Sequence, residues 1–354
     1  MGDYPFLRHE FLTALHATGC ASAKTGWQSV YLGLWRGATL AGAMPLYLKS
    51  HSRGEFVFDQ QWAGAFERHG LAYYPKLLCA VPFSPVTGPR LLAQSTVDRR
   101  ILAQGAVDLA AQLGVSSLHI LFPNEADQAC LRELGFMLRE GIQFHWHNGG
   151  YTSFEDFLAA LNHDKRKKIR QERRRVQEAG ISFLWLRGDA IDDNQLEFFY
   201  QCYANTYRQH FSSPYLSLAF FRQIAQAIPD NLLWIMAAQG SEPIACAMNV
   251  IGQGTLYGRY WGAMEFVSGL HFETCYSQAI EYCIKHGLTL FEGGAQGAHK
   301  ISRGLLPTPT WSAHWIADNR FADAIRQFLV DETRGIEDYR EELDSHTPFK
   351  KPIV

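Results

Sequence analysis

The two halves of this 354-residue chain repeat each other, and this repetition constrains the fold more than any other feature. Two alignments of the chain with itself, offset by 169 and by 204 residues, match the ends of successive elements: Phe122 with Phe291, Gly135 with Gly304, His145-Trp146 with His314-Trp315, and Ala43-Met44 with Ala247-Met248. The second offset exceeds the first by 35 residues, which predicts an insertion within the irregular region 50–90 of the first half. The agreement with element order predicts a duplicated α/β unit.

Each half has the same predicted order of elements: helix, antiparallel strands, helix, strand, helix, strand. The antiparallel strands are runs of apolar residues at 30–35 with 40–48, and at 232–238 with 244–250. A mixed sheet covered by helices follows, so the predicted class is α/β (α+β). Neither GxGxxG nor GxxxxGK[ST] follows a strand, which argues against common dinucleotide and P-loop sites.

The best linker candidate is Asn148-Gly149-Gly150. We therefore expect an N-terminal domain at 1–149, which carries the 50–90 insertion, and a C-terminal domain at 150–354. The second domain begins with a charged stretch that we expect to form a basic helix at 163–178. The chain length agrees with two or three domains of ordinary size.

Composition restricts the compartment and the kind of partner. Apolar residues make up 47% of the chain, enough for buried cores, and the net charge is −2, so any attraction to anions must come from local clusters. Seven cysteines without a CxxC pair favour buried thiols in a reducing compartment over disulfides or zinc. The N-terminus lacks a signal pattern and no long apolar run occurs, so we expect a soluble cytoplasmic protein without a transmembrane segment.

The segment 288–316 holds the densest cluster of candidate chemistry. It reads LTLFEGGAQGAHKISRGLLPTPTWSAHWI: an apolar run, an acid, a glycine-rich turn, a basic stretch and a second β-like run. Glycines after a strand let a backbone approach a ligand closely, and a helix N-terminus at such a turn favours anions. The sequence therefore predicts a ligand site in this segment.

The repeated element order is that of the GNAT acyltransferase fold, and the chain resembles the FemAB-like family of peptidoglycan biosynthesis/recognition proteins. The motifs that carry the resemblance lie at 54–63, 73–92, 163–181, 270–282 and 291–316. The resemblance implies two tandem GNAT-like domains and an N-acyltransferase role. Fem-type transferases move an amino acid from aminoacyl-tRNA onto the peptide of a cell-wall precursor, but a shared fold does not determine the substrate.

The glycine-rich segment contains two candidate bases. An amine must lose its proton to attack an ester or thioester; Glu292, at the end of a buried strand, and His299 are candidate catalytic residues for that step. An N-cap or a structural ion pair is the alternative role of Glu292. The family match favours substrate binding for Lys300 and Arg303, which would neutralise a phosphate or an oxyanion.

Two further polar groups are candidates for substrate binding. The first comprises Arg259, Tyr260, His271 and Glu273, near residues 265–271, which read EFVSGLH. GNAT proteins that use acetyl-CoA carry Gln/Arg-x-x-Gly-x-Gly/Ala there, so the departure weakens the acyl-CoA interpretation. The second lies in the insertion, and either lines an acceptor cleft between the domains or maintains a long loop: Asp59, Tyr74, Lys76 and Arg90.

The predicted basic helix places eight cations within eleven residues. A solvated helix face is one explanation. The other is phosphate contact, to tRNA first and to an anionic lipid or nucleotide-linked precursor second, because Arg forks suit phosphate oxygens. Fem-type proteins carry a comparable segment, so we assign polyanion binding to Lys165, Arg166, Lys168, Arg170, Arg173 and Arg174.

These observations predict an N-acyltransferase with one active site, in the second domain or in the cleft. The expected donor is aminoacyl-tRNA, with acyl-CoA second, consumed as a co-substrate with no tightly bound cofactor. A non-catalytic protein that binds an anionic small-molecule or lipid-linked precursor, with peripheral membrane contact, is the competing class. His145 and His147 lack partners at ligand spacing, so we expect no metal. The oligomeric state is left open.

Overall fold

The computed structural model describes residues 4–295 and 297–350, which form two compact units. Unit 1 contains residues 15–142 and 309–339, and unit 2 contains residues 4–14, 143–308 and 340–350. The divisions fall inside α1, β8, β14 and α11. Because these units are defined by contacts, whereas the expected domains were defined by the repeat and the linker, a domain boundary near residue 149 stays a prediction.

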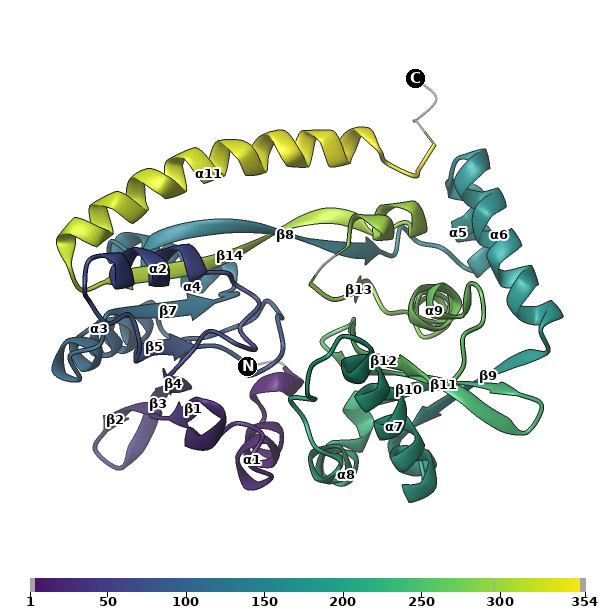
Figure 1. Ribbon diagram of the computed structural model, residues 1–354, viewed down its shortest axis with the longest axis horizontal. Helices are drawn as coiled ribbons and strands as arrows, with labels where there is room; N and C mark the ends of the chain where they lie inside the picture. Colours follow the sequence, from purple (N-terminus) through teal and green to yellow (C-terminus); the bar gives the residue numbers. More distant parts are fainter. Residues whose placement is uncertain (1–3, 296, 351–354) are drawn as a thin grey trace. The chain divides into compact units, whose positions relative to one another are not determined.

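Unit 1 has a mixed sheet with the strand order β1-β4-β5-β7-β14-β8 and a small sheet with the order β2-β3-β6 (Figure 1). Its core packs the strands against α3, through residues such as Leu77, Leu118 and Leu102. Its elements are η2 (Ala23–Thr25), β1 (Trp27–Ser29), β2 (Leu32–Arg36), β3 (Thr39–Met44), β4 (Leu46–Lys49), α2 (Gln60–Arg68), β5 (Lys76–Cys79), β6 (Leu92–Ala93), α3 (Thr96–Gln112), β7 (Ser117–Leu121), α4 (Glu125–Glu133), the start of β8 (Met137–His147), the end of β14 (Leu306–Ile316) and most of α11 (Asn319–Ser345).

Two features of unit 1 differ from the sequence-based prediction. The region 50–90 is not uniformly irregular, since it contains α2 and β5. Trp62 and Phe66, one helical turn apart, are both buried and anchor α2, although only these two positions mark its apolar face. The predicted strand 40–48 is divided at Pro45, because proline cannot donate to a sheet ladder.

Unit 2 has a sheet with the order β8-β13-β12-β11-β10-β9. All neighbouring strands from β9 to β12 are antiparallel, and β12 with β13 is parallel. Its elements are η1 (Pro5–Leu7), the start of α1 (His9–Ala17), the end of β8, α5 (Phe154–Ala160), α6 (His163–Glu178), β9 (Ile181–Arg187), η3 (Gly188–Ala190), α7 (Asp193–Gln209), α8 (Leu218–Ala227), η4 (Pro229–Asn231), β10 (Leu232–Gln239), β11 (Glu242–Gly252), β12 (Thr255–Ala263), α9 (Leu270–Phe272), the π-helix η5 (Glu273–Ser277), α10 (Gln278–Lys285), β13 (Leu290–Glu292), η6 (Ala298–Arg303) and the start of β14.

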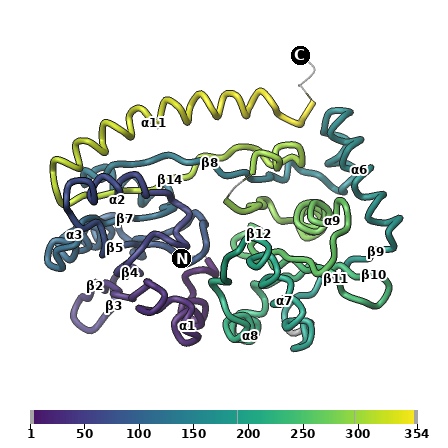
Figure 2. Tube along the Cα trace, in the orientation of Figure 1, coloured from purple at the N-terminus to yellow at the C-terminus, as the bar shows by residue number. Residues whose placement is uncertain are grey.

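Local packing in unit 2 sets the positions of the helices around β12. The Phe11 ring on α1 packs against Phe220 on α8 at 5.6 Å, and the two helices lie side by side (Figure 2). At Gly262 on β12, an added Cβ would lie 1.8 Å from the carbonyl oxygen of Cys202 on α7, so glycine permits this close approach. The charged helix expected over 153–179 is two helices, because Asn162 ends one segment and caps the next by accepting a hydrogen bond from the Lys165 amide.

Candidate functional site

In unit 2 the parallel strands β12 and β13 separate after a short pairing. Their register ends with Tyr257 opposite Glu292, after which β12 continues to Ala263 while β13 stops. The chain after β13 turns at Gly293 and Gly294, and Gly294 has a φ of 88° that favours glycine. A wedge therefore opens between the two strands, and we define it as the wedge of unit 2.

The equivalent opening in unit 1 is filled by the chain itself. Strands β5 and β7 are also parallel, but the Gly88 amide donates to the carbonyl oxygen of Phe122 (3.0 Å) and the Asn124 amide donates to that of Gly88 (2.9 Å). The fully buried Arg90 donates to the carbonyl oxygens of Leu121, Pro89 and Val86. A ligand cannot reach this guanidinium unless the loop moves, so unit 2 holds the better candidate site.

Glu292 lies at the end of β13 beside Arg259 of β12. The Arg259 Nη2 to Glu292 Oε2 distance is 3.5 Å, and both side chains are buried. Burial lowers the pKa of Arg259, and the Glu292 carboxylate opposes that shift. The guanidinium supplies the counter-charge that a buried carboxylate needs. This geometry matches the ion-pair alternative for Glu292, and its role as a base stays a prediction.

Lys300 and His299 lie on η6, directly after the glycine turn. The Lys300 Nζ donates to the carbonyl oxygen of Gly294 at 2.8 Å, and burial, followed by repulsion from Arg259, lowers its pKa to about 8. An appreciable fraction of this amine is therefore neutral near physiological pH. His299 is exposed, lies 3.2 Å from the Tyr276 hydroxyl through Nε2, and has a pKa lowered by partial burial and then by Lys300.

The segment from α9 to η5 faces these residues of η6. The His271 ring lies 5.7 Å from that of Tyr276, and burial lowers the pKa of His271 to about 4, so its imidazole is neutral at pH 7. The Arg303 guanidinium lies over the Phe272 ring at 4.1 Å. The π-helical turn η5, a feature that often marks functional sites, carries Tyr276. The structure thus brings His271, His299, Lys300 and Arg303 into one neighbourhood.

Glu273 and Arg173 pair with each other away from that neighbourhood. The Arg173 Nε lies 3.2 Å from Glu273 Oε1, its Nη2 lies 2.7 Å from Glu281, and the Gln278 amide also donates to Glu273. Burial raises the pKa of Glu273, and Arg173 opposes that shift. The two side chains therefore join α6 to the segment η5–α10 as a structural ion pair.

Helix α6 carries a groove of about 520 Å³. The groove residues occupy one face of the helix: His163, Arg166, Lys167, Arg170, Gln171 and Arg174. Three of the six residues predicted to bind a polyanion, Arg166, Arg170 and Arg174, share this groove, whereas Arg173 is committed to its ion pair. Lys165 and Lys168 lie on the same helix but do not line the groove.

The basic helix lies next to the wedge. The Arg303 Nη2 lies 2.9 Å from Glu172 on α6, and an added Cβ at Gly269, the N-cap of α9, would lie 3.5 Å from the carbonyl oxygen of Glu172. No side chain caps the N-terminus of α9 at Gly269. The α6 groove, the N-terminus of α9 and the basic residues of η6 are therefore adjacent parts of unit 2.

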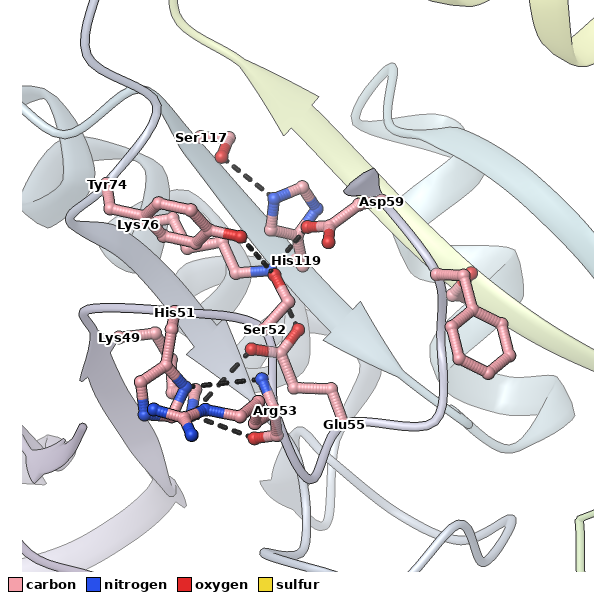
Figure 3. Close-up of polar contacts among 12 residues, drawn as sticks. Lys49, His51, Ser52, Arg53, Glu55, Asp59, Tyr74, Lys76, Ser117 and His119 are labelled. Atoms are coloured by element: carbon pink, nitrogen blue, oxygen red, sulfur yellow. Dashed lines mark hydrogen bonds and ion pairs between the residues drawn. The ribbon is translucent and has the colours of Figure 1, made fainter. Parts of the chain in front are cut away.

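Two of the residues assigned to the insertion belong to a buried network in unit 1 (Figure 3). The Lys76 ammonium donates to Glu55 and to Ser52 Oγ at 2.7 Å each, and to Asp59. Burial raises the pKa of Glu55 to about 7 even though Lys76 opposes the shift. The half-buried Tyr74 reaches the network through the Ser52 hydroxyl at 2.8 Å. Asp59, Tyr74 and Lys76 are therefore close together, and Arg90 belongs to the separate wedge-filling loop.

The network continues into a histidine pair that the sequence analysis missed. The Tyr73 hydroxyl donates to Asp59 at 2.7 Å and lies 3.0 Å from His119 Nε2; the Nδ1 atoms of His119 and His314 are 2.7 Å apart. Burial lowers the pKa of His119 to about 3 and that of His314 well below its usual range, so both are neutral and one donates to the other. The repeated Ser-x-His at 117–119 and 312–314 is the only sequence signal.

Metal ligation and membrane spanning were also considered for the described residues. Within residues 4–295 and 297–350, no cluster of three His, Cys, Asp or Glu side chains could hold a metal ion. His145 and His147 are on β8, where burial lowers the pKa of His145 to about 3. No helix in that part of the chain has the length and apolar character needed to cross a membrane.

Comparisons with known proteins agree with this architecture. The fold resembles that of FemX (12% identity, TM-score 0.56, 92% of this chain and 95% of that one) and of L-PGS from Bacillus licheniformis (10%, 0.56, 90% and 93%). It also resembles the C-terminal domain of a putative lysylphosphatidylglycerol synthetase from Agrobacterium fabrum (9%, 0.56, 91% and 96%). No curated protein matches the chain.

The predicted mixed α/β fold of the GNAT-like acyltransferase class is confirmed by the mixed sheets, flanked by helices, and by the structural neighbours. The sequence profile of a family described as peptidoglycan biosynthesis/recognition matches residues 1–351, which is nearly the whole chain. The chain therefore belongs to the FemAB-like family.

Proposed function

We propose that the protein is an N-acyltransferase that works at the wedge of unit 2. In this proposal it transfers an aminoacyl group from aminoacyl-tRNA to an amine of a cell-wall-precursor-like acceptor. Membership of a peptidoglycan-related family supports the reaction class. The observation that carries the choice of donor is the α6 groove, which presents three arginines and a lysine beside the wedge. Arginine forks suit phosphate oxygens, and a tRNA donor requires a cytoplasmic location.

The chemistry needs a base, an oxyanion partner and a positioned acceptor. The amine attacks the ester carbonyl carbon, a C–N bond forms, the C–O bond to the donor breaks, and the amine proton passes to a base and then to the departing hydroxyl oxygen. His299, neutral Lys300 and Glu292 are the bases near the glycine turn. Arg259 supplies positive charge for the oxyanion, and much of the rate comes from positioning.

An acyl-CoA donor is the second candidate, and one observation favours it. The N-terminus of α9 at Gly269 lies beside the wedge without a side-chain cap, and backbone amides at such a terminus attract phosphate. The segment 265–271 lacks the family's pyrophosphate motif, so we rank acyl-CoA below aminoacyl-tRNA. Either donor is a co-substrate that the reaction consumes.

Two assays distinguish these donors. Purified protein is mixed with labelled aminoacyl-tRNA, or with an acyl-CoA and a thiol reagent, and with a panel of amines that includes nucleotide-linked peptide precursors. We expect acceptor-dependent loss of label from tRNA and no acceptor-dependent thiol release. Thiol release alone would establish the acyl-CoA alternative. Neither reaction, together with a higher melting temperature on adding a nucleotide-linked precursor, would identify a non-catalytic binding protein.

The base is then assigned with paired variants. Glu292→Gln, His299→Gln and Lys300→Met are compared for turnover with the active donor, because each removes one candidate proton acceptor. We expect the variant of the true base to lower kcat by roughly 10²–10⁴-fold. A Glu292→Gln protein with full turnover would restrict Glu292 to its ion pair with Arg259.

A further inference from the structure

A second, smaller pocket lies against α7 and β12 of unit 2. Its volume is about 230 Å³, and its lining residues come from α7, from the turn that follows it and from β12: Tyr203, Thr206, Tyr207, His210, Ser212, Arg259, Tyr260 and Trp261. An engineered cavity of roughly 150 Å³ binds benzene, whereas pockets for whole drug-sized ligands begin at about 300 Å³. This pocket therefore suits one ring-sized group and not a complete large substrate.

The pocket walls are aromatic and are held in place by hydrogen bonds. The Tyr203 ring meets that of Tyr260 edge-on at 5.2 Å and that of Tyr207 at 5.0 Å. The Tyr203 hydroxyl accepts from the Leu216 amide at 3.2 Å, and the Thr206 hydroxyl donates to the Trp261 carbonyl oxygen at 2.8 Å. Walls fixed in this way lose little side-chain entropy when a flat or branched apolar group enters.

The charged member of the lining is Arg259. Its side chain is 3% exposed, and neither Nε nor Nη2 has a hydrogen-bond partner among the described residues. Arg259 interacts electrostatically with Glu292 and with the pocket residue Tyr260. The distance to Glu292 is 3.5 Å, longer than the roughly 2.7–2.9 Å of a charge-assisted hydrogen bond. Buried polar groups are normally hydrogen-bonded, so these nitrogens indicate a ligand that accepts hydrogen bonds.

We infer that this pocket binds a carboxylate-bearing group with a ring-sized or branched apolar body, and that this group belongs to the amine acceptor. Aromatic walls suit the apolar body, and a guanidinium binds a carboxylate through two parallel hydrogen bonds. The same guanidinium repels an ammonium group, which disfavours a cationic side chain. Residues 259–261 follow the point where β12 leaves β13, so the bound group lies near the wedge.

The assignment to the acceptor rests on the proposed function, whereas the binding of the carboxylate does not. The test is therefore a binding measurement without any acyl donor. Isothermal titration compares three probes of matched shape: phenylacetate, its neutral amide phenylacetamide, and the cation phenethylamine. We expect phenylacetate to bind at least about tenfold more tightly than the amide, and no binding of the amine, which corresponds to about 1.4 kcal/mol.

Variants locate the binding. Arg259→Lys keeps a positive charge beside Glu292 but loses the planar fork, and Ser212→Phe fills the pocket from its exposed rim. Both should weaken phenylacetate binding at least about tenfold, whereas Arg222→Gln, an exposed arginine of α8 outside the lining, should not change it. Equal binding of acid and amide, unchanged binding in Ser212→Phe, or no phenylacetate binding at millimolar concentration would overturn the inference. Failure of the tRNA assay alone would leave it standing.

Discussion

At the residue scale, unit 1 buries several ionisable side chains that its fold must keep in defined protonation states. His119 and His314 face each other with both rings neutral, and each also meets a serine hydroxyl at 2.8 Å. Protonation of either ring would place a charge in a buried site and remove an acceptor from the network. The histidine pair should therefore make stability depend on pH.

We predict that lowering the pH from neutrality destabilises the protein through this pair. Burial holds the pKa of His119 at about 3, below the 6.5 of an unperturbed histidine, so below about pH 6.5 the unfolded chain binds protons that the folded chain does not. Stability present above pH 6.5 is lost as the pH falls toward 3, by about 2 kcal/mol for His119 at about pH 5. Urea unfolding of the wild type and of His119→Asn across this range measures the effect; equal slopes would contradict it.

A second residue-scale prediction concerns Lys76. Replacing it with methionine leaves the buried Glu55 and Asp59 without their ammonium partner, and breaking a buried charge pair costs about 3–5 kcal/mol. Arg100→Met is the matched control, since it removes an exposed ion pair with Glu133 and should change stability little. Chemical denaturation compares the two; similar losses would show that the Lys76 network contributes nothing beyond a surface pair.

At the scale of the element, α6 separates cations that line a groove from cations that do not. Arg174 lines the groove and the neighbouring Arg175 does not, although both are exposed. We predict that Arg174→Glu weakens tRNA binding and flattens its dependence on salt, because the variant loses a phosphate contact and each contact contributes to the slope. Arg175→Glu should retain more affinity, since its charge points away from the groove.

The measurement for α6 is a titration of labelled tRNA at several salt concentrations with both variants and the wild type. A diffuse electrostatic effect of the whole helix would reduce affinity equally in the two variants. Equal losses would therefore reject the groove as the binding surface, and a wild-type affinity independent of salt would reject polyanion binding by α6 altogether.

The packing of α7 on β12 gives another element-scale prediction. Gly262→Ala would place a methyl group 1.8 Å from the Cys202 carbonyl oxygen, so the backbones must move apart, at a cost of about 2 kcal/mol or more. The small pocket between these elements would be distorted as well. Gly335→Ala on α11, where an added Cβ meets nothing within 4 Å, should be neutral or stabilising. Thermal unfolding of both variants decides; an unaffected Gly262→Ala protein would contradict this packing.

At the scale of the whole molecule, two related units differ in whether their parallel strands leave an opening. The loop at Gly88 and Arg90 fills the opening in unit 1, whereas β12 and β13 of unit 2 separate at a glycine turn surrounded by ionisable side chains. We predict that one chain binds one equivalent of the productive donor. Equilibrium titration with the donor that proves active measures the stoichiometry, and two equivalents of equal affinity would show that both units bind.

Several features of the protein were readable from the sequence alone. The order of elements, the mixed α/β class and the family resemblance are encoded locally, because hydrophobic periodicity, glycines and prolines act on neighbouring residues. The same locality explains why 163–178 was recognised as a basic helix and 288–316 as a ligand segment. It also explains the failure at α2, where two anchoring aromatics make a weak periodic signal.

Only the tertiary structure decided which of these residues meet. Sequence reasoning grouped Asp59, Tyr74, Lys76 and Arg90, yet the fold assigns three to a buried network and the fourth to the loop that fills the opening of unit 1. It also places the Arg259 guanidinium beside both Glu292 and an aromatic pocket. Such encounters depend on strand register and on helices packed from distant parts of the chain. Local sequence determines which elements form, and long-range packing determines which charges are buried, paired or available to a ligand.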